Sequence, residues 1–300
     1  MPTIGWLDRT SGPIEQAAAF NRGLAEVGYV VGRNVNLEYR NAEGDNDRLR
    51  ELAADFVRRK VAVIVTTSGG ATLAAKAATQ TIPIVFGMGG DPVEQGVVAS
   101  LNRPGGNLTG ISVLGAEIAA KRLELLHELV PKAESVAALL SDSPTSSDYS
   151  QAQTRGFQSA ALALGLRLLL ITAVTESEIA GAFANAVQQH VGALVVGADR
   201  PFNSVQAQLI SLSNRYSLPT LFFRRDAVAA GALASYGNDA LEAIRRVGVY
   251  TGRILKGDRP SDLPVQRMTK FELVINLKTA KALGLNVSQD MLSIVDEVIE

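Results

Sequence analysis

The chain has 300 residues, a formal net charge of −1 and no cysteine. This composition excludes disulfides, thiolate nucleophiles and cysteine-bound metals, and a charge so close to zero provides no basic face for nucleic acid. Because no run of about 18 or more apolar residues occurs, the sequence predicts no membrane span, and its length predicts two domains.

Buried strands and amphipathic or alanine-rich helices alternate along the first part of the chain. Apolar, β-branched runs predict the strands, and apolar residues at helical spacing predict the helices. In chain order we expect a strand at 3–7, a helix ending at 27, a strand at 35–39, a helix at 47–59, a strand at 61–65, a helix at 71–80, a strand at 82–86, a loop at 87–92 with a helix through 100, a strand at 109–113 and a helix at 117–130.

A second series begins after Pro131, which ends the preceding helix. Its expected elements are strands at 135–140 and 193–196 and helices at 150–164 and 204–216. This restart predicts two lobes in an α/β fold with parallel sheets. We expect the chain to cross between the lobes near 112–115, at 232–236 and near 260–265. The expected lobes are residues 1–113 with 236–262, and residues 114–235 with 263–300.

Polar loops follow four of these strands, and each loop opens a helix. The segment 66–72 (TTSGGAT) is the most informative, because a buried strand precedes it and an alanine-rich helix follows it. A helix N-terminus carries unpaired N–H groups and favours a carboxylate or phosphate. Taken alone, this junction is more typical of a plain N-cap. Several such loops at the carboxyl edge of a parallel sheet predict a ligand site.

We expect residues of these loops to contact a small molecule. The candidates are Asp8, Arg9, Thr67, Ser68 and Gly89 in the first lobe, Ser143, Tyr149, Asp199 and Phe202 in the second, and Tyr236 at a crossing. Each candidate also has a purely structural alternative. Asp8 would cap the first helix, Tyr149 would be a half-exposed loop residue, and Phe202 would pack against its own helix.

We expect two of the candidates, Ser68 and Asp199, to bind ligand groups of opposite charge. We expect the Ser68 hydroxyl, with the N–H groups of Gly69 and Gly70, to hold a carboxylate. We expect the Asp199 carboxylate to accept a ligand ammonium, and the alternative is that Asp199 caps the next helix or pairs with an arginine. Together the two poles would select an amino acid.

Enzyme motifs are missing. The sequence has no phosphate loop and no G-x-S-x-G nucleophile elbow, and the segment 87–92 lacks the last glycine of G-x-G-x-x-G. His127 and His190 have no visible partner cluster for catalysis or metal binding. We therefore expect no enzymatic activity, no cofactor and no metal.

Several segments resemble those of one protein family. They are 82–86 (IPIVF), 91–93 (DPV), 96–98 (GVV), 103–110 (RPGGNLTG), 235–237 (SYG), 254–257 (ILKG), 263–265 (LPV) and 270–285 (KFELVINLKTAKALGL). In these segments the chain is similar to ABC-transporter substrate-binding proteins of the tryptophan/tyrosine-uptake type. The resemblance implies the type I periplasmic-binding-protein fold, with two Rossmann-like lobes, three hinge strands and a ligand between lobes that close on it. It also implies a monomer exported to the periplasm, a signal peptide removed, and permease and ATPase subunits as partners.

Three functional classes are compatible with a two-lobed α/β chain. We favour a solute receptor of an ABC importer, binding an amino acid, aromatic or otherwise, or a related carboxylate. The alternative is a two-lobed α/β enzyme acting on a nucleotide sugar or a similar polar substrate, which requires an acid/base pair and phosphate-binding arginines. A sugar-repressor-like regulator would require a helix-turn-helix, and we expect none before Thr3.

Overall fold

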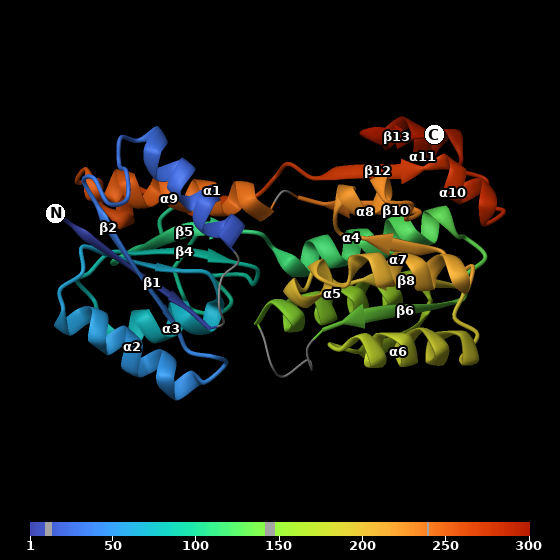
Figure 1. The fold of residues 1–300 in the computed structure, drawn as a ribbon, viewed down its shortest axis with the longest axis horizontal. Helices are drawn as coiled ribbons and strands as arrows, with labels where there is room; N and C mark the ends of the chain where they lie inside the picture. The colour runs from blue at the N-terminus through green and yellow to red at the C-terminus, as the bar shows by residue number, and fades with distance from the viewer. Residues whose placement is uncertain (10–13, 142–147, 239) are drawn as a thin grey trace. The chain divides into compact units, whose positions relative to one another are not determined.

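The computed structural model describes residues 1–9, 14–141, 148–238 and 240–300, and they form two compact units (Figure 1). Unit 1 consists of Met1–Leu114 with Asp239–Thr269, and unit 2 consists of Gly115–Asn238 with Lys270–Glu300. Each unit is a sheet covered by helices on both faces, which is the layered α/β arrangement that the alternating pattern predicts. No helix in the described ranges is long and apolar enough to cross a membrane.

The sheet of unit 1 has six strands in the order β11-β5-β4-β3-β1-β2, and all of its pairings are parallel. The strands are β1 (Thr3–Asp8), β2 (Asn36–Asn41), β3 (Val63–Thr66), β4 (Ile84–Met88), β5 (Leu108–Ser112) and β11 (Gln266–Arg267). In Figure 1, α1 (Ile14–Glu26) and α9 (Ala240–Leu255) lie on one face, and α2 (Asn46–Arg58) and α3 (Gly69–Ala78) lie on the other.

The sheet of unit 2 has seven strands in the order β13-β12-β10-β9-β8-β6-β7. They are β6 (Ser135–Leu140), β7 (Arg167–Thr172), β8 (Ala193–Val196), β9 (Thr220–Phe222), β10 (Ala234–Gly237), β12 (Glu272–Asn276) and β13 (Glu297–Ile299). The pairing of β10 with β12 is antiparallel and the other pairings are parallel.

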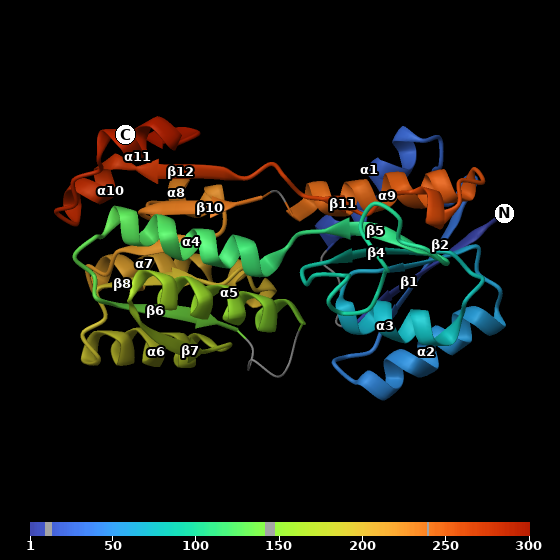
Figure 2. The ribbon, with the colours of Figure 1, turned by 180° about the vertical axis from the view of Figure 1, so that it is seen from behind.

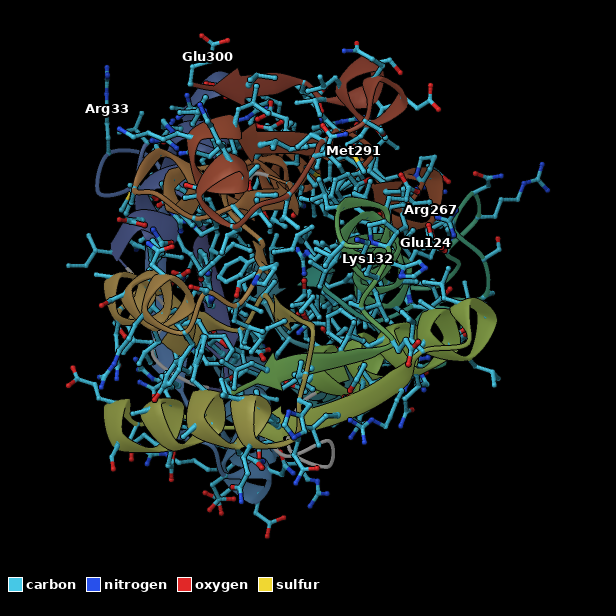
Figure 3. All side chains as sticks on the ribbon, turned by 90° about the vertical axis from the view of Figure 1, so that its right-hand side faces the viewer. Arg33, Glu124, Lys132, Arg267, Met291 and Glu300 are labelled. Carbon is cyan, nitrogen blue, oxygen red and sulfur yellow. The ribbon has the colours of Figure 1, made fainter. Side chains whose placement is uncertain are left out.

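Alternate residues of strand β6, which lies between β8 and β7, enter two separate cores of unit 2. Val136, Ala138 and Leu140 belong to one core and Ala137 and Leu139 to the other, because successive side chains of a strand point to opposite faces. The first core is covered by α4 (Gly115–Leu129), α5 (Asp148–Leu164), α10 (Leu277–Ala282) and α11 (Gln289–Ile294), whose Met291 is labelled in Figure 3. The second is covered by α6 (Glu176–Gln188), α7 (Gln206–Arg215) and α8 (Arg225–Ala229). The view from behind shows α4 and α5, which cover the first core (Figure 2).

The last two boundaries between the units lie a few residues later than the sequence predicts. Strand β10 continues to Gly237, because it pairs with β12 of the same unit along its whole length. The segment that we assigned to the second lobe from residue 263 onward begins in unit 1, because β11 pairs with β5 and Pro264 O accepts a hydrogen bond from Tyr250 Oη at 2.8 Å.

The predicted helix through residue 100 is wrong. The Asp91 carboxylate accepts hydrogen bonds from Val93 N (2.7 Å) and Glu94 N (3.1 Å) and so forms a local turn. Gly96 follows with a φ of 66°, in the left-handed region, which ends any helical path. The segment is a series of hydrogen-bonded turns.

Close helix crossings pack both units. A Cβ atom at Gly23 of α1 would lie 1.9 Å from Arg245 O of α9, and one at Gly248 of α9 would lie 2.2 Å from Phe20 O. In unit 2, a Cβ atom at Gly156 of α5 would lie 2.1 Å from Ala116 O of α4. These helices approach so closely that only glycine fits at the crossing points.

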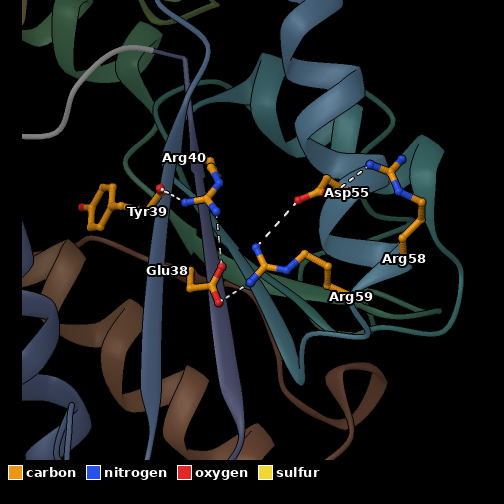
Figure 4. Close-up of polar contacts among 6 residues, drawn as sticks. All are labelled: Glu38, Tyr39, Arg40, Asp55, Arg58 and Arg59. Atoms are coloured by element: carbon orange, nitrogen blue, oxygen red, sulfur yellow. Dashed lines mark hydrogen bonds and ion pairs between the residues drawn. The ribbon is translucent and has the colours of Figure 1, made fainter.

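Charged side chains line β2, the edge strand of unit 1 (Figure 4). Glu38 pairs with Arg59 of the α2 C-terminus at 2.6 Å and with Arg40 at 3.6 Å. Arg59 also pairs with Asp55 at 3.7 Å, and Asp55 pairs with Arg58 at 2.8 Å. Ion pairs along an exposed strand discourage pairing with another chain.

Acid is expected to weaken unit 1 through Glu242 of α9. Arg245 Nε at 2.6 Å and Arg246 Nε at 2.9 Å from its carboxylate lower the pKa of Glu242 to about 2. The stabilisation is therefore complete above the unfolded-state pKa of about 4.3 and is lost as the pH falls toward 2. Glu242→Gln should lower the free energy of unfolding by about 1 kcal/mol at pH 7. Urea titrations at pH 7 and below pH 3 check this, and a deficit that is equal at both pH values would contradict it.

Candidate functional site

Asp8 is the centre of the carboxyl edge of the sheet in unit 1. It ends β1, is 1% exposed, and accepts hydrogen bonds from Arg9 N at 2.7 Å and from Thr67 Oγ1 at 2.6 Å. Strand β1 lies between β2 and β3, so the strand order reverses here, at the point where open α/β sheets bind ligands. The structure therefore brings together three predicted residues, Asp8, Arg9 and Thr67.

Ser68 is the N-cap of α3 at the same edge. Its backbone is extended, and its Oγ accepts a hydrogen bond from Ala71 N at 3.4 Å. Ser68 therefore caps the helix as its structural alternative predicts, although the capping hydrogen bond is long. The next two N–H groups, of Gly69 and Gly70, begin the helix, where an anion is favourable.

A buried hydroxyl pair holds the α3 junction in shape. Thr66 Oγ1 and Thr72 Oγ1 are 2.8 Å apart, and Thr72 Oγ1 donates to Ser68 O at 2.7 Å. Gly89, another candidate, follows β4 and is partly exposed. Since β3 and β4 are parallel neighbours, Gly89 lies at the same edge as Ser68.

Asp199 has the corresponding central place in unit 2. It is 6% exposed and accepts hydrogen bonds from Ser141 N (2.9 Å), Ser150 Oγ (3.2 Å) and Gln153 Nε2 (3.0 Å). Gln153 Oε1 in turn accepts from Ala198 N at 2.7 Å. The carboxylate thereby joins the ends of β6 and β8 to the first turn of α5.

These contacts correct two expectations around Asp199. Its side chain makes no capping hydrogen bond to the following turn, so the capping alternative is wrong. The next element is a short 3₁₀ helix, Arg200–Asn203, and α7 begins only at Gln206, because Pro201 lies in the first turn and Ser204 Oγ bonds back to Pro201 O.

Arg122 of α4 is a polar residue of unit 2 that our sequence analysis did not select. It is 1% exposed, its Nε donates to Tyr236 O at 2.7 Å, and its guanidinium carbon lies 5.9 Å from the centre of the Phe223 ring. It also shares a hydrogen bond with the Tyr149 side chain. The available signal was a charged residue among the apolar positions of a predicted helix.

Burial sets the protonation of this pair. Loss of hydration lowers the pKa of Arg122, whereas Tyr149 and then the negative Asp199 act to raise it. Burial also raises the pKa of Tyr149, against the effect of the Arg122 charge. The Tyr149 hydroxyl therefore stays protonated at neutral pH.

The remaining candidates have different surroundings. Phe202 is 1% exposed and lies in the second core of unit 2. Tyr236 is partly buried, and its ring stacks on Phe271 with centres 5.8 Å apart. Tyr149 is partly exposed, and Ser143 lies outside the described residues. Contact of any candidate with a ligand stays a prediction.

Two α/β units, each with a polar carboxyl edge at its strand-order reversal, are the arrangement expected of a solute-binding protein. The chain belongs to the family of ABC transporter substrate binding proteins, whose family model matches residues 12–299. This confirms the predicted family and leaves the alternative of a nucleotide-sugar enzyme without support.

Individual relatives extend over most of the chain. It is 30% identical over 267 residues to the tyrosine-binding protein of Clostridioides difficile (strain R20291), which covers 89% of this chain and 75% of the relative. A structure from Streptococcus pneumonia in complex with L-Trp is 28% identical, with a TM-score of 0.79 and 99% of both chains covered. A Vibrio cholerae conserved domain protein is 25% identical, with a TM-score of 0.81 and 99% of both chains covered. The predicted type I periplasmic-binding-protein fold is confirmed.

Proposed function

We propose that the chain is the extracytoplasmic receptor of an ABC importer and binds an aromatic amino acid. The tyrosine-binding relative carries this proposal, and the L-Trp-bound structure supports it. The polar edges described above supply chemistry suited to the two charges of an amino acid, with the first N–H groups of α3 near Ser68 and a carboxylate at Asp199. The proposed partners are a permease and an ATPase, the proposed location is the periplasm, and the proposed state is a monomer.

The proposal is tested with protein freed of copurifying ligand by unfolding and refolding. Isothermal titration calorimetry with L-tyrosine, L-tryptophan and L-phenylalanine should show one site, and L-aspartate serves as the control. The receptor should also return its ligand unchanged, because we propose that it catalyses no reaction. Absence of binding to all three aromatic amino acids would refute the proposed ligand. Conversion that increases with protein concentration would refute the receptor role.

Replacement of Ser68 by alanine is expected to weaken carboxylate binding about tenfold. A charge-assisted hydrogen bond contributes about 1.5–3 kcal/mol, whereas the long cap bond to Ala71 N contributes about 0.5 kcal/mol to stability. The matched control is Ser288→Ala, since Ser288 caps α11 by accepting from Met291 N at 3.1 Å. The control should lose similar stability and keep its affinity. Equal affinities for L-tyrosine in both variants, measured by calorimetry, would remove Ser68 from the binding site.

A further inference from the structure

Unit 2 buries a guanidinium whose hydrogen-bonding partners, among the residues that the structure describes, are neutral. Arg122 bonds to a carbonyl, Tyr236 O, and to the Tyr149 hydroxyl, and it faces the Phe223 ring. Among the described residues, no carboxylate forms an ion pair with Arg122. Asp199 influences Arg122 through its charge. The Asp199 carboxylate accepts hydrogen bonds from the neutral donors Ser141 N, Ser150 Oγ and Gln153 Nε2.

One part of this guanidinium has no partner. Arg122 Nη1 is buried without a hydrogen bond in the part of the chain that the structure describes, and the same holds for the hydroxyl of Ser141. A buried donor without an acceptor is unfavourable, and more so when it is charged. Buried polar groups are nearly always satisfied, so an exception calls for a group that supplies the missing bond.

The position of Arg122 indicates where that group comes from. Tyr236 O lies near the end of β10, Phe223 follows β9 directly, and Ser141 follows β6. Both unpartnered atoms therefore belong to residues gathered at the carboxyl edge of the sheet, which is the ligand edge of such folds. Tyr149 is partly exposed and hydrogen-bonded to Arg122, so it connects the buried guanidinium with the surface.

We propose that Arg122 recognises the ligand by donating a hydrogen bond from Nη1 to a ligand oxygen. The inference rests on the proposed function, since it assigns a partner atom of an aromatic amino acid. Two oxygens have the required acceptor chemistry, those of the carboxylate and that of the tyrosine phenol. If the carboxylate is the partner, Arg122 takes the role that we predicted for Ser68.

Arg122→Met is the decisive variant, because it keeps much of the volume and removes every donor. Its matched control is Arg167→Met, which removes another bridging arginine of unit 2, bonded to Ser135 Oγ at 3.1 Å and Gln189 O at 2.8 Å. Arg167 lies at the opposite edge of the sheet, at the start of β7. Arg122→Lys, which keeps the charge and one donating group, is the second variant if the methionine variant does not fold.

Calorimetry with L-tyrosine, L-phenylalanine and tyramine separates the two ligand oxygens. The dissociation constant of Arg122→Met for L-tyrosine should rise about 30-fold or more, while Arg167→Met changes it less than about threefold. If the phenol is the partner, the loss disappears for L-phenylalanine. If the carboxylate is the partner, the loss disappears for tyramine.

Other outcomes overturn the inference. An unchanged affinity for L-tyrosine, or an equal loss for all three ligands, would show that Arg122 only supports the fold. Wild-type protein is titrated first, and its failure to bind any of the three would refute the proposed function itself. The melting temperature of the ligand-free variants gives a separate readout. Arg122→Met leaves Tyr236 O without its donor and should lower the melting temperature by a few degrees, so affinities are compared well below the melting transition of both proteins.

Discussion

Replacement of Gly23 by alanine is expected to lower the free energy of unfolding of unit 1 by about 2–4 kcal/mol. The added Cβ atom would lie 1.9 Å from Arg245 O, and this neighbour is backbone that cannot rotate away. Helices α1 and α9 would have to separate, which exposes apolar surface between them. Gly156→Ala should act in the same way on unit 2, since its Cβ atom would meet Ala116 O at 2.1 Å. Denaturant unfolding followed by circular dichroism measures both losses.

Gly181 provides the control for these substitutions. It lies within α6, and a Cβ atom there would have no neighbour within 4 Å. Gly181→Ala should therefore raise stability by about 0.5–1 kcal/mol, because alanine is the better helix former. If Gly23→Ala and Gly181→Ala had the same effect, close crossing of α1 and α9 would not be what requires glycine.

Replacement of Asp199 by alanine is expected to cost unit 2 about 3–5 kcal/mol and to abolish ligand binding. The substitution leaves Ser141 N, Ser150 Oγ and Gln153 Nε2 without their acceptor in a buried place. Asp296→Ala is the matched control, because its carboxylate accepts from one backbone group, Leu273 N, at 2.8 Å. The control should lose about 1 kcal/mol, as judged by thermal unfolding.

Asp199→Asn separates the structural role from the proposed recognition of an ammonium. Asparagine keeps one acceptor oxygen for the buried donors and loses the negative charge. If Asp199 accepts the ligand ammonium, this variant should lose L-tyrosine and still bind 4-hydroxyphenylpropionate, which lacks the amine. Equal weakening of both ligands would leave Asp199 with the structural role alone.

The sequence predicts local elements of this molecule well where they are strongly apolar. The runs at 61–65 and 135–140 indicate strands because buried parallel strands are apolar on both faces. The repeated order of strand, loop and helix does not hold at 91–99, where we expected a helix through residue 100. There the Asp91 turn and the left-handed Gly96 determine the backbone, and both are local effects.

The sites are less predictable, because their partners are distant in sequence. The carboxyl-edge argument correctly located Asp8 and Thr67, and they are joined although 59 positions separate them. It could not predict that Gln153 holds both Asp199 and Ala198 N, since that depends on β6 and β8 being neighbours in the sheet. It also missed Arg122, which is distinguished by its burial and by an Nη1 atom that has no hydrogen bond among the described residues.

The way in which the chain returns to each unit has a consequence for its biosynthesis. Helix α9 covers the sheet of unit 1, and β12 completes the sheet of unit 2, yet both are made after residue 238. Contacts such as that of Glu26 with Arg245 join residues 219 positions apart. A nascent chain therefore cannot cover the α9 face of the unit 1 sheet, or complete the first core of unit 2, until these segments have been translated. We expect folding to be slow and largely post-translational, with apolar surface open to chaperones until then.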